Sequence, residues 1–567
     1  MILNRVLFTL LVLLSFSLKA QITEPELDVL VEKTMKTFNV PGIAVGIVKD
    51  GKLVVAKGYG VSNINTKQKV DANTLFGIAS NSKSFTAAAL GILVDEGKLN
   101  WDDKVIKYLP EFKMYNDYVT QEFTIRDLLT HRSGLGLGAG DLMIWPDGHN
   151  FTPNDIVKNI QYLKPVSGFR TKYDYDNLLY VIAGEVVAKV SGKSWCDFVE
   201  ERIMKPIGMK NSAASWNRLK DTTNVIVPHV PVSGKLQVIK RYTNPIFDAA
   251  AGLYTSVNDL SNWLILQMNE GKINDQVIFS KEVHHDMWTS QTILPQRNAY
   301  PYTSNFKTYG LGWQLMDVNG HLQVSHTGGL DGIVTQTIMI PDIKLGIIVL
   351  TNQQSGAAFN SISNTIKDSY LGLPKFDHLT YLSQERKNKE DDADKINAND
   401  LLNTFKEANK EQNEERIAQK IQPYYVGGWA EKPRYDKASH QMIWAIEVKE
   451  VDSADAPADT INYNTRMLGR RGVLSMNLVV SPKELELGKQ KVATLLQNVK
   501  FNKGQTYAEY VAGTDKVAGY GLAGLILGGG AMAAAAKFGV FGALWKWGLG
   551  ILLVLKKFII IGIVGVA

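Results

Sequence analysis

The chain has 567 residues, of which 45% are hydrophobic and 21% charged, and its formal net charge is +6. This length exceeds that of one ordinary domain, and the small, scattered positive charge forms no basic block of the kind that binds nucleic acid. Cys196 is the only cysteine, which excludes an intramolecular disulfide and is most typical of a small core residue.

The first twenty residues have the pattern of a secretory signal. Arg5 precedes a short apolar run over residues 6–14, and Ala20 stands where cleavage is expected. The apolar run is shorter than a membrane span requires. We therefore predict a signal peptide over residues 1–20, with an uncleaved anchor as the alternative.

Two short β-rich runs at residues 43–48 and 53–56 are joined by Lys-Asp-Gly-Lys, which predicts a hairpin. From about residue 103 to residue 245 the chain is mainly helical and loop-like. The expected helices are 123–130, 155–163 and 178–191, and the expected later strands are 312–315, 322–326, 334–340 and 345–350. Strands on both sides of a helical block predict one sheet built from both ends of the domain.

A Ser-x-x-Lys pair follows the hairpin. Ser80 comes after a short apolar entry, and Lys83 leads into an Ala/Leu-rich run that predicts a buried helix. Residues three apart share a helical face, so the Lys83 amine can reach the Ser80 hydroxyl. A desolvated lysine can activate a serine, and N–H groups at a helix start can hold an oxyanion. Taken alone, the pair is more typical of a helix-capping serine beside a solvated lysine.

Two further motifs accompany this pair. A Tyr-Asp-Asn motif at 175–177 precedes an expected helix, and a His-Thr-Gly-Gly motif at 326–329 closes an expected strand. Each also has a purely structural interpretation. Tyr175 alone is typical of a core aromatic, Asn177 of a helix cap, and His326 of a strand residue beside a glycine turn. The joint occurrence of the three motifs favours chemistry.

In this order and spacing the motifs resemble the serine β-lactamase and penicillin-binding-protein superfamily. They are most similar to its class C-like branch, which includes D-alanyl-D-alanine carboxypeptidases, D-aminopeptidases and esterases. The resemblance spans about residues 24–373 and places His131 in a packed turn. It implies an α+β fold, with an antiparallel sheet flanked by helices and a mainly helical subdomain. Further stretches that carry the resemblance are 128–135, 206–209, 250–256 and 309–313.

The resemblance implies a role for each catalytic residue. Ser80 would be the nucleophile that forms an acyl-enzyme, and Lys83 would take or relay its proton. Tyr175 would be the partner base, or the acid toward the leaving group. A phenol can do this only if nearby cations lower its pKa, and Lys83 is expected to be such a cation. Asn177 would orient Lys83 and the substrate amide.

The strand motif would bind the substrate. His326 stands where many relatives have a lysine. A lysine at this position favours a carboxylate-bearing substrate, whereas a histidine is compatible with peptidases and esterases as well. Thr327 and Gly328 would line the substrate site. The backbone N–H groups of Ser80 and Gly329 would form the oxyanion hole. No metal and no cofactor is expected.

The composition changes near residue 383. Residues 383–420 are dense in charge and predict a solvated helix or linker, and residues 421–515 predict a small β-rich region of unknown function. The strands expected there are 442–448, 460–468 and 473–480. From about residue 391 onward the chain resembles the C-terminal part of an uncharacterised family of predicted membrane-anchored bacterial proteins. The chain therefore looks like the products of two partial genes joined near residues 383–392, either as a natural fusion or as an artefact.

The C-terminal segment, residues 516–567, is predicted to enter a membrane. Residues 517–536 form an uninterrupted apolar run of the length of a transmembrane helix. Lysines interrupt the apolar residues 538–567, which predicts a second imperfect span or an interfacial or re-entrant segment. These lysines favour a cytoplasmic side, which leaves residues 21–516 in the periplasm, anchored in the inner membrane.

The sequence therefore predicts a secreted, membrane-tethered serine hydrolase with its catalytic domain over residues 21–382. Its expected substrate is a small molecule or peptide of the cell envelope: a D-amino-acid peptide, a β-lactam or an ester. The alternative is a penicillin or muropeptide sensor that is acylated without turnover. The expected partners are this substrate and the membrane but not nucleic acid, and the oligomeric state stays open.

Overall fold

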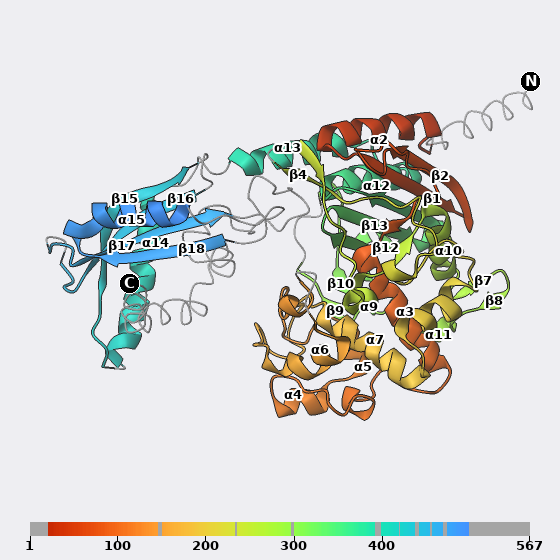
Figure 1. The fold of residues 1–567 in the computed structure, drawn as a ribbon, viewed down its shortest axis with the longest axis horizontal. Helices are drawn as coiled ribbons and strands as arrows, with labels where there is room; N and C mark the ends of the chain where they lie inside the picture. Colours follow the sequence, from red (N-terminus) through yellow and green to blue (C-terminus); the bar gives the residue numbers. More distant parts are fainter. Residues whose placement is uncertain are drawn as a thin grey trace, which may run out of the picture. The chain divides into compact units, whose positions relative to one another are not determined.

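A computed structural model describes residues 21–145, 150–232, 235–295, 300–391, 398–418, 420–436, 441–453, 456–468 and 473–497. The chain divides into two compact units (Figure 1). The first runs to Leu382 but excludes residues 231–235, and the second holds these five residues and the chain from Ser383 onward. The predicted signal peptide and membrane segment lie outside the described residues. Among the described helices, none combines the length and the apolar character that a membrane span requires.

The first unit is built on an antiparallel sheet with the strand order β2-β1-β14-β13-β12-β11-β10-β9. Strands from both ends of the unit meet at its centre, where β1 (Gly42–Lys49) pairs with β14 (Leu345–Thr351). The predicted sheet from both ends of the domain is confirmed. The other strands of this sheet are β2 (Lys52–Gly60), β9 (Thr292–Ile293), β10 (Lys307–Tyr309), β11 (Gln314–Val318), β12 (His321–Leu330) and β13 (Ile333–Ile340).

Helices cover both faces of this sheet (Figure 1). On one face α2 (Glu24–Phe38) and α12 (Gly356–Leu371) pack their apolar stripes against β1, β13 and β14. On the other face lie α10 (Val257–Met268) and α3 (Ser82–Asp95), which belong to a separate core cluster. Because both faces are covered, β1 and β14 are buried along their length, which explains their unbroken apolar sequences.

The helical block between the early and late strands forms a subdomain. Thr124 caps α5 (Ile125–Leu129) in a capping box with Asp127, so this helix is shorter than the predicted 123–130. The other helices from here to residue 300 are α4 (Asp117–Glu122), α6 (Pro153–Asn159), α7 (Leu178–Ser191), α8 (Trp195–Val199), α9 (Asp248–Ala251) and α11 (Lys281–Met287). Two short two-stranded pairs complete the unit: β3 (Phe76–Gly77) with β6 (Tyr254–Thr255), and β7 (Lys272–Ile273) with β8 (Gln276–Val277). A third pair, β4 (His229–Val232) with β5 (Lys235–Val238), includes residues 231–235, which are grouped with the other unit.

Helix α7 has the predicted bounds, because Gly192 ends it in the left-handed conformation with φ of 72°. The helix predicted at 155–163 is wrong in its second half. Helix α6 stops at Asn159, and a 3-10 turn at Ile160–Tyr162 replaces its last turn.

The first unit continues beyond residue 373, where the family resemblance was expected to end. Helix α13 (His378–Asp391) begins with a histidine whose Nε2 lies 2.6 Å from the Asp368 carboxylate. The Tyr302 hydroxyl donates to the other oxygen of the same carboxylate over 2.8 Å. His378 and Asp368 are both buried, so this cluster fixes the start of α13 to α12.

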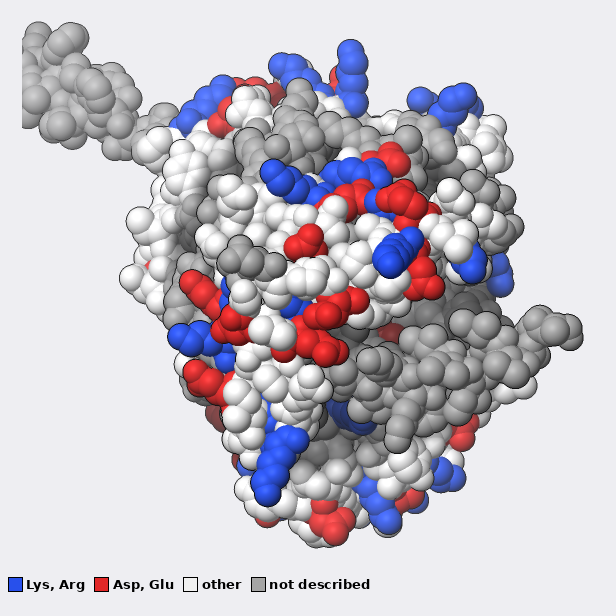
Figure 2. Space-filling view, turned by 90° about the vertical axis from the view of Figure 1, so that its left-hand side faces the viewer, with Lys and Arg blue, Asp and Glu red and all other residues white. Residues whose placement is uncertain are grey.

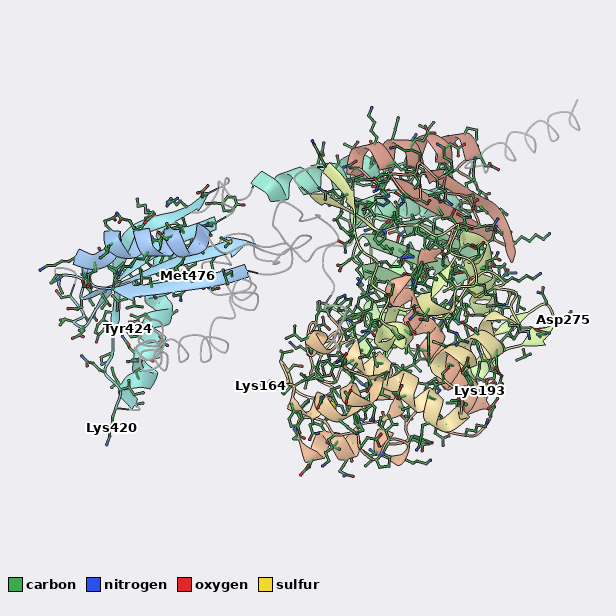
Figure 3. The ribbon with its side chains drawn as sticks, viewed as in Figure 1. Lys164, Lys193, Asp275, Lys420, Tyr424 and Met476 are labelled. Atoms are coloured by element: carbon green, nitrogen blue, oxygen red, sulfur yellow. The ribbon has the colours of Figure 1, made fainter. Side chains whose placement is uncertain are left out.

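The second unit holds a four-stranded antiparallel sheet, β15-β16-β17-β18. Tyr424, labelled in Figure 3, leads into β15 and donates its hydroxyl to Gln412 of α14 over 2.6 Å. The predicted bounds of β17 and β18 are confirmed, and the observed β16 is one residue longer at each end than predicted. Strand β15 was not predicted. Its Gly-Gly and Pro residues are unfavourable in a strand and are tolerated at this sheet edge, where its register is irregular. The elements are α14 (Ala398–Ala418), β15 (Tyr425–Asp436), β16 (Gln441–Lys449), β17 (Thr460–Leu468), β18 (Val473–Val480) and α15 (Leu485–Gln497).

Acidic and basic side chains are interspersed on the molecular face seen in Figure 2. Among the described residues of that face, no continuous basic field of the kind that binds a nucleic-acid backbone is visible.

Candidate active site

Ser80 lies in a strained turn at the start of α3. The 3-10 segment η1 (Ala79–Asn81) precedes the helix, and Ala79 has a positive φ of 50°, which is uncommon for a residue with a side chain. The preceding carbonyl, that of Ile78, holds this turn. It accepts hydrogen bonds from the backbone and side-chain N–H groups of Asn81 and from the Thr335 hydroxyl. The turn presents the Ser80 side chain beside the first turn of α3.

The Ser80 hydroxyl lies between two ionisable groups. Lys83 Nζ is 3.1 Å from Ser80 Oγ, and the Tyr175 hydroxyl donates to the same oxygen over 2.9 Å. Lys83 reaches Ser80 from one turn further along the chain, as the spacing predicted. Tyr175 comes from the segment before α7. The geometry therefore joins the first two sequence motifs at one oxygen atom.

Asn177 and a backbone carbonyl fix the Lys83 amine. Lys83 Nζ donates to the Asn177 side-chain oxygen over 2.9 Å and to the Ala250 carbonyl over 3.0 Å. Asn177 occupies the N-cap position of α7, but its side chain makes no capping hydrogen bond. Its amide is therefore directed to Lys83. The sequence did not identify the Ala250 carbonyl as a contact, although residues 250–256 were among the stretches that carry the family resemblance.

Burial sets the charge state of the site. Lys83 is fully buried, and loss of hydration lowers its pKa to about 7. Burial raises the pKa of Tyr175 above its ordinary value of 10, and the hydrogen bond to Ser80 offsets only part of this shift. The expectation that Lys83 lowers the pKa of Tyr175 is therefore wrong. The buried Asp176 carboxyl, with its pKa raised to about 8, is also largely uncharged at neutral pH.

Strand β12 brings the third motif to Ser80. A Cβ atom at Gly328 would lie 2.1 Å from the Ile78 carbonyl oxygen, so only glycine allows the strand to approach the turn before Ser80 this closely. Strand β11 pairs with β12 only as far as Ser325, so the strand motif extends beyond that pairing. Thr327 and Gly329 are exposed there. The oxyanion hole of the Ser80 and Gly329 N–H groups stays a prediction.

His326 makes its ring contacts inside the protein. Its Nε2 lies 2.9 Å from the Tyr309 hydroxyl, and its Nδ1 lies 2.7 Å from the Thr327 carbonyl oxygen. His326 is 2% exposed, and desolvation lowers the pKa of its ring to about 3. Both ring nitrogens of His326 therefore have protein partners, and its part in substrate binding stays a prediction.

His131 lies behind the site as a member of a buried aromatic cluster. Its ring is 4.2 Å from that of Tyr175 between centroids and 4.8 Å from that of Tyr309. Its Nδ1 accepts the Asp176 N–H over 3.2 Å, and its carbonyl accepts the Asp174 N–H over 2.7 Å. The packed position implied by the resemblance is thus observed. Neither periodicity nor spacing indicated its contact with Tyr175.

Among the described residues, no group of three or more His, Cys, Asp or Glu side chains is arranged to hold a metal ion. The side chains gathered around Ser80 are suited to nucleophilic attack and proton transfer.

Comparisons with known proteins agree with this geometry. A sequence model described as Beta-lactamase matches residues 27–370, and one described as a protein of unknown function, DUF2167, matches residues 365–567. Among curated proteins, the unguisins hydrolase ungD of Aspergillus violaceofuscus is 26% identical, with 62% of this chain and 65% of that protein covered. Protein flp of Staphylococcus aureus is 28% identical, covering 59% and 64%. The chain spans less than two thirds of the length of these relatives.

Solved structures show the same fold. The octameric penicillin-binding protein homologue from Pyrococcus abyssi is similar with a TM-score of 0.56 and 24% identity, over 81% of this chain and 90% of that one. A class C beta-lactamase is similar with a TM-score of 0.50 and 21% identity, over 62% and 96%. With the family match covering more than half of the sequence, the chain belongs to the Beta-lactamase family.

Proposed function

We propose that the chain is a serine hydrolase that acts on an amide or ester through an acyl-enzyme. The observation that carries this proposal is the position of the Ser80 hydroxyl between Lys83 Nζ, at 3.1 Å, and the Tyr175 hydroxyl, at 2.9 Å. A serine needs a nearby proton acceptor to attack a carbonyl carbon. A lysine with a pKa of about 7 is substantially uncharged at neutral pH and can be that acceptor.

The acylation step follows from these contacts. Neutral Lys83 takes the Ser80 proton as Oγ attacks the substrate carbonyl carbon. The developing oxyanion would be held by the N–H groups of Ser80 and Gly329. Tyr175 keeps its proton because burial raises its pKa, so it acts as the acid. It gives its proton to the leaving amine or alkoxide as that bond breaks, and Lys83 returns a proton to the phenol.

Deacylation reverses the proton path. A water molecule attacks the ester of Ser80, its proton passes to the Lys83–Tyr175 pair, and Ser80 leaves with a proton restored. If the acyl-enzyme forms but is not hydrolysed, the protein is instead the acylated sensor considered from the sequence. The chemistry of acylation is the same in both cases, so the rate of turnover separates them.

We extend the proposal to location. The signal-like residues 1–20 and the apolar run 517–536 support a secreted enzyme tethered to the inner membrane, with a substrate in the cell envelope. Protease accessibility of the catalytic unit in spheroplasts tests this placement. Protection of that unit from externally added protease would contradict it.

The activity itself is tested with the full chain and p-nitrophenyl esters, a chromogenic cephalosporin and D-alanyl peptides. Ser80→Ala should abolish turnover and covalent labelling by a fluorophosphonate probe. Ser261→Ala is the control, because Ser261 is a buried serine of α10 whose hydroxyl donates to the Asn258 carbonyl, away from Lys83 and Tyr175. Labelling of another serine in the wild-type protein would contradict the assignment.

A further inference from the structure

We infer that the Tyr309–His326 pair makes the strand side of the site uncharged, so that the enzyme prefers an ester or amide without a carboxylate next to the scissile bond. This inference rests on the proposed function and adds a substrate class to it. It concerns the position at which many relatives have a lysine.

The backbone places His326 on the catalytic side of β12. Side chains alternate along a strand, so His326 lies on the same face as Gly328, and Gly328 packs against Ile78 and Ala79 immediately before Ser80. The Lys83 amine acts electrostatically on His326, which also indicates proximity. A charge on the His326 ring would therefore act electrostatically on a substrate bound at Ser80.

The hydrogen bonds of the ring define its protonation. Nδ1 lies 2.7 Å from the Thr327 carbonyl oxygen, which only accepts, so Nδ1 carries a hydrogen. Nε2 then accepts the hydrogen of the Tyr309 hydroxyl over 2.9 Å. Both nitrogens are thereby satisfied within the protein. No ring N–H of His326 is left to bind a substrate carboxylate.

The surroundings of the pair oppose a positive charge on it. His326 and Tyr309 are both buried, and Tyr309 packs edge-on against the ring. The other titratable groups acting on His326 are Lys83 and the buried His131. Lys83, when protonated, disfavours a second cation, and His131 supplies no negative charge.

The energetic consequence concerns the leaving group. A carboxylate brought beside this strand loses hydration and gains no cation in return, which is unfavourable. A neutral leaving group loses less hydration and can hydrogen-bond to the strand backbone. The favoured substrates are therefore neutral esters and amides, including internal peptide bonds, and not β-lactams or peptides cut next to a free carboxylate.

The experiment uses two esters that differ only in charge, phenyl phenylacetate and 3-carboxyphenyl phenylacetate. For the full-length protein we expect kcat/KM for the neutral ester to equal or exceed that for the charged ester. His326→Lys should shift this ratio at least tenfold toward the charged ester. Tyr309→Phe, which frees Nε2, should shift it the same way at pH 5.5 and less at pH 8. Tyr173→Phe, a substitution in the same aromatic cluster, is the control and should not shift the ratio.

A wild-type preference of tenfold or more for the charged ester would overturn the inference. So would an unchanged ratio in both His326→Lys and Tyr309→Phe, each checked for a native circular dichroism spectrum. Hydrolysis of neither ester, together with no acylation of Ser80, would overturn the proposed function and this inference with it. Turnover of both esters with the wrong preference would overturn the inference alone.

Discussion

The hydroxyl oxygens of Tyr175 and Ser80 lie 2.9 Å apart although the two residues are 95 positions apart in the sequence. Burial keeps the phenol protonated, so Tyr175 is the donor in this hydrogen bond. The lone pair that accepts the Ser80 proton must then come from Lys83. This division of roles leads to separate predictions for each residue.

We predict that Lys83→Ala and Tyr175→Phe each slow acylation by at least about a hundredfold, the scale of general acid–base catalysis. The double variant should be little slower than the slower single variant, because groups that move one proton together act as a unit. Rapid-quench measurement of alcohol release from an alkyl ester, whose leaving alkoxide needs a proton, gives the acylation rates. Multiplicative losses in the double variant would show that the two residues do not share the proton path.

The pH dependence of kcat/KM should follow Lys83. The proton acceptor must be uncharged, so activity should rise with pH and level off above the Lys83 pKa of about 7. A neutral ester should be used, so that the substrate itself does not titrate. A profile that falls between pH 6 and pH 8 would contradict neutral Lys83 as the base.

The lowered pKa of Lys83 also predicts that the stability of the protein depends on pH. The unfolded Lys83 side chain has a pKa of about 10.4. Between that value and the folded pKa of about 7, the unfolded chain binds more protons, so this residue makes stability rise with pH across that window. The stability advantage of Lys83→Met over the wild type should therefore grow as the pH falls from 10 to 7. Urea unfolding at these pH values measures it, and an advantage independent of pH would contradict the buried, shifted lysine.

His131 is predicted to position Tyr175. His131→Phe keeps an aromatic ring against Tyr175 but removes the acceptor of the Asp176 N–H. Leaving a buried N–H unpaired should destabilise the protein by about 1–3 kcal/mol. It should also lower kcat more than it raises KM, because the displaced phenol acts in the transition state. His284→Phe, another buried histidine beside an aromatic ring, is the control for stability without an effect on kcat.

The sequence indicated the parts of the site that are local in the chain. The spacing of Ser80 and Lys83 is a helical turn, and Gly192 ends α7 where the pattern indicated. Tertiary contacts were not accessible in this way. Tyr309 reaches His326 only because β10 and β12 flank β11 in the sheet. The direction of the Tyr175 pKa shift was missed because it depends on burial, which the fold produces.

The end of the hydrolase unit gives the last prediction. We expect residues 21–382 to fold and to match the full chain in activity, because the catalytic motifs and the His378 cluster all lie within them. Residues 21–373 should be less stable, since they retain buried Asp368 without its His378 partner at 2.6 Å. A buried carboxylate that loses a charge-assisted hydrogen bond is destabilised by about 1.5–3 kcal/mol.

Melting temperatures of both fragments, with His378→Ala in the full chain as the matched variant, measure this contribution. His378→Ala should reproduce most of the loss seen on shortening the fragment to residue 373, because both remove the same contact. The aromatic contacts of Phe376 and Tyr381 with Tyr300, and the packing of Leu379 and Leu382 against the core of the unit, account for the remainder of the loss. Equal melting temperatures for the two fragments would show that α13 does not stabilise the hydrolase unit. A large loss of activity in residues 21–382 would show that the enzyme depends on the residues beyond Leu382.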